Sequence, residues 1–203
     1  AMPAGTRNAI GLVVDYLLAN RVGNEAETAY FQVLHKLHAS TDGSALGIAA
    51  DDGLFTPLTV IGGTMKMVDG RMIQSVDSRF PTNTTGETIR DALTAVAGSA
   101  AAVEHVSIAA PFYIEADAAL IQALIDTYNQ VTGENAKPFT MGGGTYARHF
   151  PLAVSFGPER QDLVLPEFAG PMHGANEGAK IEHLMQALKI YILALLRLQE
   201  IEL

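Results

Sequence analysis

The fold of the first half is decided by Leu58-Thr-Val-Ile-Gly-Gly-Thr-Met-Lys-Met-Val68, followed by Asp69-Gly70 and by Arg71-Met-Ile-Gln-Ser-Val-Asp-Ser-Arg-Phe80. Apolar and polar residues alternate along much of both runs, which is the period of a β-strand. An Asp-Gly pair between two such runs is the strongest short-range signal for a hairpin, because both residues tolerate the turn geometry. The sequence therefore predicts an antiparallel hairpin that turns at Asp69-Gly70.

Helical periodicity surrounds this hairpin on both sides. Residues 6–20 form an expected helix whose inward face carries Ile10, Val13, Val14, Leu17 and Leu18. Asn24 is the expected cap of a second helix that ends at His38, with an inward face of Ala29, Val33, Leu34 and Leu37. Thr84 or Thr85 is the expected cap of a third helix, which ends near Ala97 and buries Ile89, Leu93 and Val96.

A further strand is expected at 103–113, with Val106 and Ile108 inward. The order from residue 6 is then helix, helix, strand, strand, helix, strand. If the second helix is an insertion and one further strand precedes Thr6, the order becomes the βαββαβ pattern of a ferredoxin-like sandwich. We therefore expect residues 1–114 to form a ferredoxin-like domain whose first strand is missing upstream of Ala1. The sheet edge left open favours pairing with a second copy, so a homodimer is a further expectation.

Residues 115–203 have the pattern of one flank of a larger α/β domain. The sequence predicts a helix from Asp117 to Gly133, a short strand at 153–156, and a last helix from Asn176 or Glu177 to about Arg197. The expected buried face of the first of these helices carries Leu120, Leu124, Ile125 and Tyr128. Apolar positions on the last helix are dense enough to need a broad cover, which this half lacks: Ile181, Leu184, Leu188, Tyr191, Ile192 and Leu195.

Composition excludes several classes of function. A net charge of -9 and a pI near 5.0 argue against nucleic acid, whose phosphates need a basic face. The chain has no cysteine, so a metal would have to be held by histidines and carboxylates. No apolar run reaches the roughly 18 residues of a membrane span. We therefore expect a cytoplasmic protein with neither a nucleic acid nor a membrane as partner.

Gly142, Gly143 and Gly144, followed by Thr145, form the second unusual stretch. Consecutive glycines adopt backbone angles closed to other residues and allow a ligand to approach, although such a run is more often only a turn. A phosphate-binding loop would connect a strand to a helix and include a lysine. No lysine adjoins this run, which disfavours phosphate binding. His35 and His38 lie three residues apart without a neighbouring carboxylate, so we expect them to serve packing or the surface.

Several motifs together carry a resemblance to a known family. Gly142-Gly-Gly-Thr-Tyr-Ala-Arg148, Ala153-Val-Ser-Phe-Gly-Pro158 and Met172-His-Gly-Ala-Asn-Glu177 resemble the C-terminal part of peptidase V-type dipeptidases. These belong to the di-zinc exopeptidases, together with carnosinase, succinyl-diaminopimelate desuccinylase, aminoacylase and glutamate carboxypeptidase. Asp77-Ser-Arg79-Phe-Pro81 resembles the strand end of the family's lid domain, and Pro3-Ala-Gly-Thr-Arg-Asn8 resembles the segment after the lid histidine. The resemblance runs through nearly the whole chain.

The resemblance implies roles for individual residues. His173 would be a ligand of one of two zinc ions. Gly144 and Thr145 would bind the free carboxylate of a dipeptide through backbone N–H groups, and Arg79 would make a charge-assisted contact to the same carboxylate. The alternative for Arg79 is a solvated arginine at a strand end. Asn176 and Glu177 would lie at the start of the last helix.

The family also uses a His-x-Asp pair, a bridging aspartate, an adjacent Glu-Glu and a further aspartate, and none of these motifs occurs here. Asp51-Asp52 and the Glu25/Glu27 pair lack a partnering histidine motif. We therefore expect the lid domain (1–114) and the C-terminal catalytic segment (115–203) of a zinc-dependent dipeptidase. Its N-terminal catalytic half would be a missing partner, and the chain alone would be inactive and without catalytic residues. The alternative is a binding or dimerisation module that works through the lid.

Overall fold

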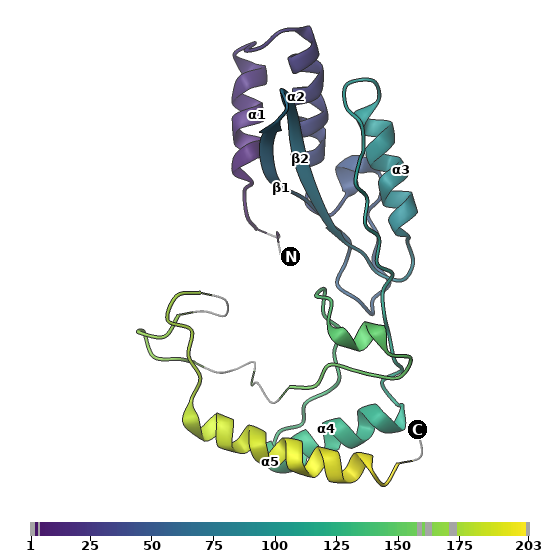
Figure 1. Cartoon of the computed structure of the whole chain (residues 1–203), viewed down its shortest axis with the longest axis vertical. Helices are drawn as coiled ribbons and strands as arrows, with labels where there is room; N and C mark the ends of the chain where they lie inside the picture. The colour runs from purple at the N-terminus through teal and green to yellow at the C-terminus, as the bar shows by residue number, and fades with distance from the viewer. Residues whose placement is uncertain (1–2, 4, 158–159, 161–163, 171–173, 202–203) are drawn as a thin grey trace. The chain divides into compact units, whose positions relative to one another are not determined.

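The computed structural model describes residues 3, 5–157, 160, 164–170 and 174–201, and the chain divides into two compact units. Unit 1 comprises Ala1–Pro111 together with Thr140–Gly143, and unit 2 comprises Phe112–Phe139 and Gly144–Leu203. Helices accompany a two-stranded antiparallel sheet (Figure 1), so the predicted α+β class is confirmed. The assignment of 1–114 to a lid and of 115–203 to a catalytic segment stays a prediction.

The predicted hairpin forms the sheet of unit 1. Strand β1 (Thr59–Val68) pairs antiparallel with β2 (Arg71–Arg79), and the register shifts once, between Gly62 and Met65. Asp69 and Gly70 have φ angles of 48° and 74°, the positive values that a two-residue type I′ turn requires. The hairpin prediction is therefore confirmed, turn included.

Three α-helices accompany the hairpin, and a side chain caps the start of each. Asn8 accepts from the backbone of α1 (Ala9–Ala19), so this helix starts at Ala9 rather than Thr6. Asn24 and Glu27 form a reciprocal capping box on α2 (Glu25–His38). Thr85 caps α3 (Gly86–Ala97). The two predicted caps and the ends of α2 and α3 are thus confirmed; a short 3-10 turn, η1 (Ser44–Leu46), lies between α2 and β1.

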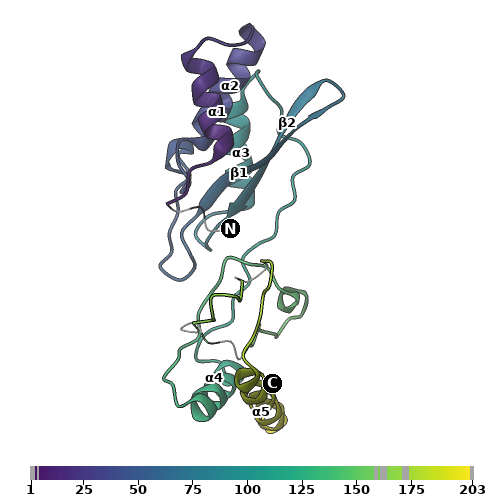
Figure 2. The same cartoon turned by 90° about the vertical axis from the view of Figure 1, so that its left-hand side faces the viewer.

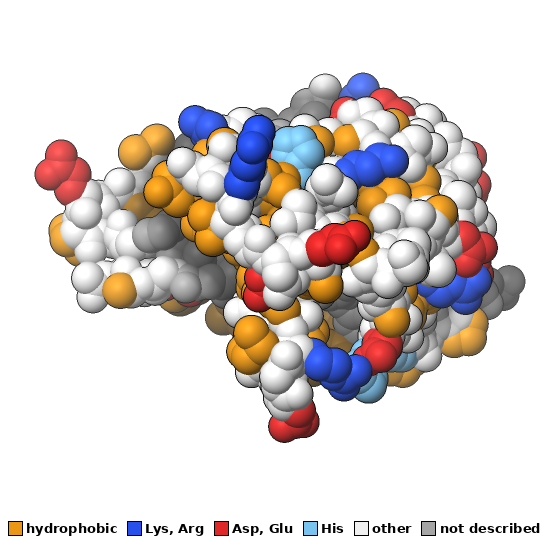
Figure 3. Space-filling view, turned by 90° about the horizontal axis from the view of Figure 1, so that it is seen from above, with side chains coloured by type: hydrophobic (Ala, Val, Ile, Leu, Met, Phe, Trp, Pro, Cys, Tyr) orange, Lys and Arg blue, Asp and Glu red, His pale blue; other side chains and the backbone are white. Residues whose placement is uncertain are grey.

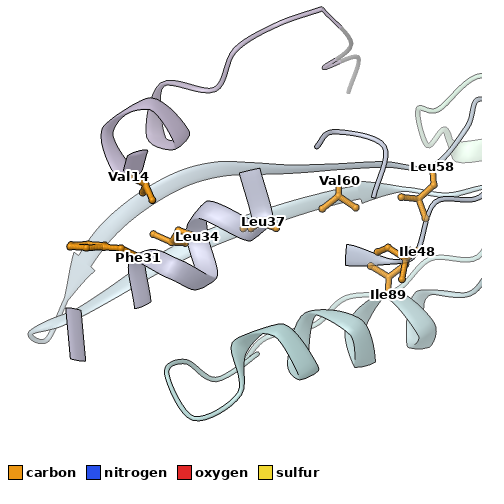
Figure 4. Close-up of a cluster of buried hydrophobic side chains, with 8 residues drawn as sticks. All are labelled: Val14, Phe31, Leu34, Leu37, Ile48, Leu58, Val60 and Ile89. Carbon is orange, nitrogen blue, oxygen red and sulfur yellow. The ribbon is translucent and has the colours of Figure 1, made fainter. Parts of the chain in front are cut away.

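The core of unit 1 lies between these helices and one face of the hairpin (Figure 2). Figure 4 shows its eight buried side chains, which come from α1, α2, α3, β1 and the segments around them: Val14, Phe31, Leu34, Leu37, Ile48, Leu58, Val60 and Ile89. Two details differ from the expected faces. Val13 is 57% exposed, and Phe31, which helical spacing alone did not single out, is buried.

The strand predicted at 103–113 is wrong: these residues form no strand, and Val106 and Ile108 are 48% and 40% exposed. Ile108 instead packs so closely on Gly86 that a Cβ there would overlap its side chain. In a split βαβ unit, the two strands joined by a helix are separated by a third strand. The expected first strand would fill that position, and no strand among the described residues takes its place, so the expected sheet pairing of this segment does not form.

Unit 2 is built on two helices, α4 (Ala119–Thr132) and α5 (Ile181–Leu198), with a short 3-10 helix, η2 (Tyr146–His149), between them in the chain. The two helices pack through a small cluster that buries Leu120, Leu124 and Ala194, with Val154, Phe156 and Leu198 beside it. Arg197 on α5 donates from Nη1 to the buried Thr127 hydroxyl of α4 at 2.8 Å. Gly133, with a φ of 76°, ends α4 as predicted.

Two expectations for unit 2 are wrong. Residues 153–156 form no strand. The last helix starts at Ile181 rather than at Asn176 or Glu177. Asn176 has a φ of 60°, which no residue inside a right-handed helix adopts, and its carbonyl accepts from the Gly170 N–H at 2.9 Å. Asn176 and Glu177 therefore close a turn with Gly170 instead of starting α5.

The apolar face of α5 is open to solvent. All six positions expected to need a cover are 41–73% exposed, and Met185 and Leu196 extend the same exposed surface. We call these eight residues the α5 face: Ile181, Leu184, Met185, Leu188, Tyr191, Ile192, Leu195 and Leu196. None of the helices among the described residues combines the length and the hydropathy that crossing a lipid bilayer requires.

Candidate functional site

Arg79 lies at the end of β2 and is held from two sides. Asp77, two residues earlier on the same face of the strand, accepts from Arg79 Nε at 2.8 Å and from Nη2 at 3.0 Å. Nη1 donates to the carbonyl oxygen of Gly142 at 3.2 Å. The side chain of Arg79 is 37% exposed. The guanidinium is therefore fixed in orientation while part of it still faces solvent.

The segment Thr140–Gly142, which belongs to unit 1, also contacts the turn at residues 51–56. The Thr140 hydroxyl donates to the Leu54 carbonyl at 2.7 Å. A Cβ at Gly142 would lie 3.5 Å from the Thr56 hydroxyl oxygen, an ordinary contact. We call residues 51–56 the Asp52 turn. The start of the glycine run thus contacts Arg79 on one side and the Asp52 turn on the other.

The Asp52 carboxylate organises the Asp52 turn. Its Oδ1 accepts from the backbone N–H of Leu54 at 2.9 Å and of Phe55 at 2.8 Å. Its Oδ2 accepts from the backbone N–H of Thr82 at 2.8 Å and from the Thr82 hydroxyl at 2.6 Å. The Thr82 hydroxyl first, and then the Phe55 amide, hold the pKa of Asp52 well below its ordinary value. This carboxylate, which the sequence shows only as one of a pair, is a structural acceptor.

Gly144 and Thr145 belong to unit 2, where Arg148 and Ser155 surround them. A Cβ at Gly144 would lie 3.0 Å from Arg148 Nη1, so a larger residue would displace that guanidinium. The Ser155 hydroxyl donates to the Thr145 hydroxyl oxygen at 2.7 Å. None of the three glycines of the run has a left-handed φ, and of the three only Gly144 would bring a Cβ as close as 3.0 Å to a neighbouring atom.

His173 lies outside the described residues. On its two sides in the chain, Gly170 and Glu177 form an isolated bridge, and a Cβ at Gly170 would overlap the Ala175 carbonyl. Among the residues that the structure describes, no group of three His, Cys, Asp or Glu side chains could hold a metal ion. The described part of the chain therefore does not fit a zinc site by itself.

The two histidines of α2 serve packing and a surface contact. His35 Nδ1 lies 2.7 Å from Asp15 Oδ1 on α1, in a pair whose side chains are more than half exposed. The His38 ring lies so close to Gly62 of β1 that a Cβ there would overlap it. Burial lowers the pKa of His38. His38 thus serves packing and His35 lies at the surface, within the alternatives expected from the sequence. The sequence pattern did not indicate the contact with Asp15, because that residue comes from the neighbouring helix.

Charge is mixed on the surface that Figure 3 shows. Acidic and basic side chains alternate with hydrophobic ones over the described part of this face. Nucleic-acid binding uses clustered basic residues. This face therefore offers no such cluster.

Comparison with known proteins identifies the family. The family model of peptidase family M20/M25/M40 matches residues 12–197. A Bacillus subtilis (strain 168) protein named "Putative dipeptidase YtjP" is 26% identical over 192 residues, which are 94% of this chain and 40% of that protein. A Staphylococcus saprophyticus protein, also named as a "Putative dipeptidase", is 36% identical over 91 residues, or 43% of this chain and 18% of that protein. The chain thus spans about 40% of the length of the Bacillus relative, and it belongs to peptidase family M20/M25/M40.

Proposed function

We propose that the chain is part of a zinc-dependent dipeptidase and that Arg79 recognises the free C-terminal carboxylate of the dipeptide. The observation that carries this proposal is the fixed, partly exposed guanidinium beside the first carbonyl of the glycine run. Membership of a peptidase family and likeness to proteins named as dipeptidases supply the reaction class. A peptidase specific for dipeptides must recognise a chain terminus, and a planar guanidinium matches a carboxylate well.

Arg79 keeps donors for a substrate. A guanidinium has five N–H groups, and the contacts with Asp77 and Gly142 use three of them, which leaves two. Because Asp77 binds the Nε and Nη2 edge, the remaining donors belong to Nη1 and Nη2. These two nitrogens form the end of the fork, and a carboxylate can accept from both.

Gly144 and Thr145 are proposed to bind the same carboxylate through their backbone N–H groups. The Thr145 hydroxyl accepts from Ser155, and a hydroxyl that accepts one hydrogen bond can still donate its own proton. A Cβ at Gly144 would meet Arg148 Nη1 at 3.0 Å, so a side chain there would shift the Arg148 guanidinium.

The zinc centre is proposed to be completed from outside this chain. His173 would supply one ligand, and an N-terminal catalytic half would supply the remaining ligands and the general base. Two observations support this: the described residues lack a metal-binding group, and the chain spans 40% of the Bacillus relative. The α5 face is the surface that such a half would cover. A cytoplasmic location stays a prediction.

The proposal is tested by kinetics on the complete enzyme with a dipeptide and its C-terminal amide. Arg79→Ala removes a contact of about 2–5 kcal/mol, or roughly thirty- to several thousand-fold in kcat/KM, for the free acid. The loss should be much smaller for the amide, and zinc content should not change. Arg71→Ala is the matched control, because Arg71 lies at the other end of β2. Equal losses on both substrates would show that Arg79 does not read the carboxylate.

The missing half has its own test. The chain alone, supplied with zinc, should show no dipeptide hydrolysis, since one imidazole holds zinc weakly. Turnover by the pure chain that a chelator abolishes would contradict the proposal, because the ligands and the base would then be present here.

Exposed apolar residues on the hairpin favour a second candidate, a binding or dimerisation module. Met67, Val68, Ile73 and Val76 are 38–65% exposed, and within the described residues each strand has only one paired edge. Open edges invite pairing with another chain. Sedimentation should then give twice the chain mass of 21.6 kDa, and Ile73→Lys should return the chain to a monomer. A monomer at high concentration would rule this candidate out.

A further inference from the structure

The two neighbouring carboxylates Asp51 and Asp52 have different roles in the structure. Asp51 Oδ1 accepts from the backbone N–H of Gly53 at 2.9 Å, which is a local turn contact. Asp52 accepts four hydrogen bonds, two from its own turn and two from Thr82, thirty residues away in the chain. Asp52 therefore joins two separate segments through its side chain, and the Asn83 side chain adds one contact between the same segments by donating to the Asp51 carbonyl at 2.9 Å.

The two segments that Asp52 joins contact the start of the glycine run from different sides. The Asp52 turn offers the Leu54 carbonyl to the Thr140 hydroxyl at 2.7 Å. Thr82 follows β2 closely, and Arg79 at the end of that strand donates to the Gly142 carbonyl. All of these residues belong to unit 1. The placement of Thr140–Gly142 against Arg79 thus depends on both segments, and Asp52 holds the segments together.

We propose that Asp52 is a positioning residue for the carboxylate-binding site: by tying the Asp52 turn to Thr82, it keeps the Thr140–Gly142 segment in register with Arg79. This inference rests on the proposed role of Arg79. Asp52 does not touch the substrate and acts only through the segments that it joins. Its loss should therefore weaken substrate binding more than it slows the chemical step.

One substitution affects the contacts of the Asp52 carboxylate with Thr82 more than its contacts within its own turn. In Asp52→Asn, the amide oxygen can keep the contacts with Leu54 and Phe55, but the amide nitrogen is a donor. It would face the backbone N–H of Thr82, while the Thr82 hydroxyl would have to turn round and accept instead of donating. The turn is then preserved while its link to Thr82 loses the backbone hydrogen bond and the negative charge. Thr82→Val weakens the same link from the other side, and Thr82→Ser preserves it.

The experiment measures KM and kcat of the complete enzyme on the free-acid dipeptide and on its amide. Loss of a charged hydrogen bond predicts about a tenfold or larger rise in KM for the free acid in Asp52→Asn, with kcat within about twofold. Thr82→Val should raise KM in the same way, and Thr82→Ser and Asp51→Asn should resemble the unmodified enzyme. In an Arg79→Ala background, Asp52→Asn should have little further effect, because the two residues act on one site.

The outcomes separate this inference from the proposed function. If Arg79→Ala abolishes discrimination between acid and amide while Asp52→Asn and Thr82→Val leave KM unchanged, only the role of Asp52 is overturned. Equal effects of Asp52→Asn on acid and amide, or a fall in kcat alone, also overturn it, since they indicate a general structural role. If Arg79→Ala leaves discrimination intact, the proposed function fails first. If the Asp52→Asn variant does not fold, the comparison of Thr82→Val with Thr82→Ser tests the role of Asp52 instead.

Discussion

Units 1 and 2 differ in how far their own residues complete them. All three α-helices of unit 1 start with a side-chain cap, whereas α4 and α5 of unit 2 start at Ala118 and Lys180 without one. Unit 1 buries eight side chains in one cluster, and the α4–α5 cluster buries three. The longest helix among the described residues is α5, which belongs to unit 2 and carries the exposed α5 face.

This difference shows what each sequence encodes. In unit 1, local signals and burial agree, and such agreement is what specifies a single structure. In unit 2, the residues of α5 are patterned for burial that the described chain does not supply. An exposed apolar patch of this kind marks an interaction surface. This contrast supports the proposal that unit 2 is part of a larger assembly, and the following experiments test that proposal.

The largest effect is expected from truncating matched leucines in the two units. Leu58 is 1% exposed and Leu188 is 54% exposed. Leu58→Ala should lower the free energy of unfolding by about 2–5 kcal/mol. Leu188→Ala should change it by no more than about 0.5 kcal/mol in this chain. Denaturant unfolding followed by circular dichroism measures both, and a large loss for Leu188→Ala would show that the α5 face is already covered.

A second effect should come from the close approach of β1 to α2. Gly62→Ala places a methyl group where the His38 ring lies, so unit 1 should lose about 1–3 kcal/mol of stability. The same substitution should cost much less in a His38→Ala background, where the ring is gone. Equal costs in both backgrounds would mean that the strand, rather than the ring, opposes the methyl group.

Exchange of helix caps tests the contrast directly. Asn24→Ala removes the side-chain half of the capping box on α2, the acceptor of the Glu27 N–H, and should cost about 0.5–2 kcal/mol. Lys180 has the extended backbone of a cap residue, with a φ of -74° and a ψ of 133°, but its side chain caps nothing. Lys180→Asn should therefore stabilise α5. If melting curves show no gain in stability, the backbone N–H groups at the start of α5 already have hydrogen-bond partners.

The smallest effect concerns pH. Burial lowers the pKa of His38, while Gln74 and Asp15 oppose the shift. The unfolded chain, with an ordinary histidine pKa of about 6.5, then binds more protons than the folded chain just below that pH. The contribution of His38 is therefore fully present above about pH 6.5 and is lost as the pH falls through the lowered pKa. Melting temperatures between pH 8 and pH 5 should show this loss, and His38→Gln should reduce it.

Local signals explain most of what the sequence predicted. Asp69-Gly70, Asn24, Thr85 and Gly133 each act within a few residues of chain, and the structure contains all four features. The strand expected at 103–113 depends on a distant partner strand, so periodicity alone could not determine it. Asn176 was misassigned because its left-handed backbone belongs to a turn with Gly170, and no residue pattern predicts that turn.

The candidate site was predictable only through motifs. Arg79, Gly144, Thr145 and His173 were found by resemblance, and their roles stay proposals. The contacts around Arg79 were not visible in the sequence, since Gly142 lies sixty-three residues away in the chain. Asp52 was noticed only as a carboxylate without a histidine. The role of Asp52 depends on Thr82, and the sequence does not show that a threonine thirty residues away in a loop will bind this carboxylate.

The α5 face also has a consequence for biosynthesis. A helix that displays eight apolar side chains attracts chaperones and other copies of itself while it remains bare, and the time it stays bare sets the yield of folded protein. If the covering half is encoded upstream, as proposed, it leaves the ribosome before α5 does, and the helix can dock as soon as it emerges. Separate expression of this chain would reverse that order. Coexpression with the upstream half should then raise the soluble yield before any activity is measured.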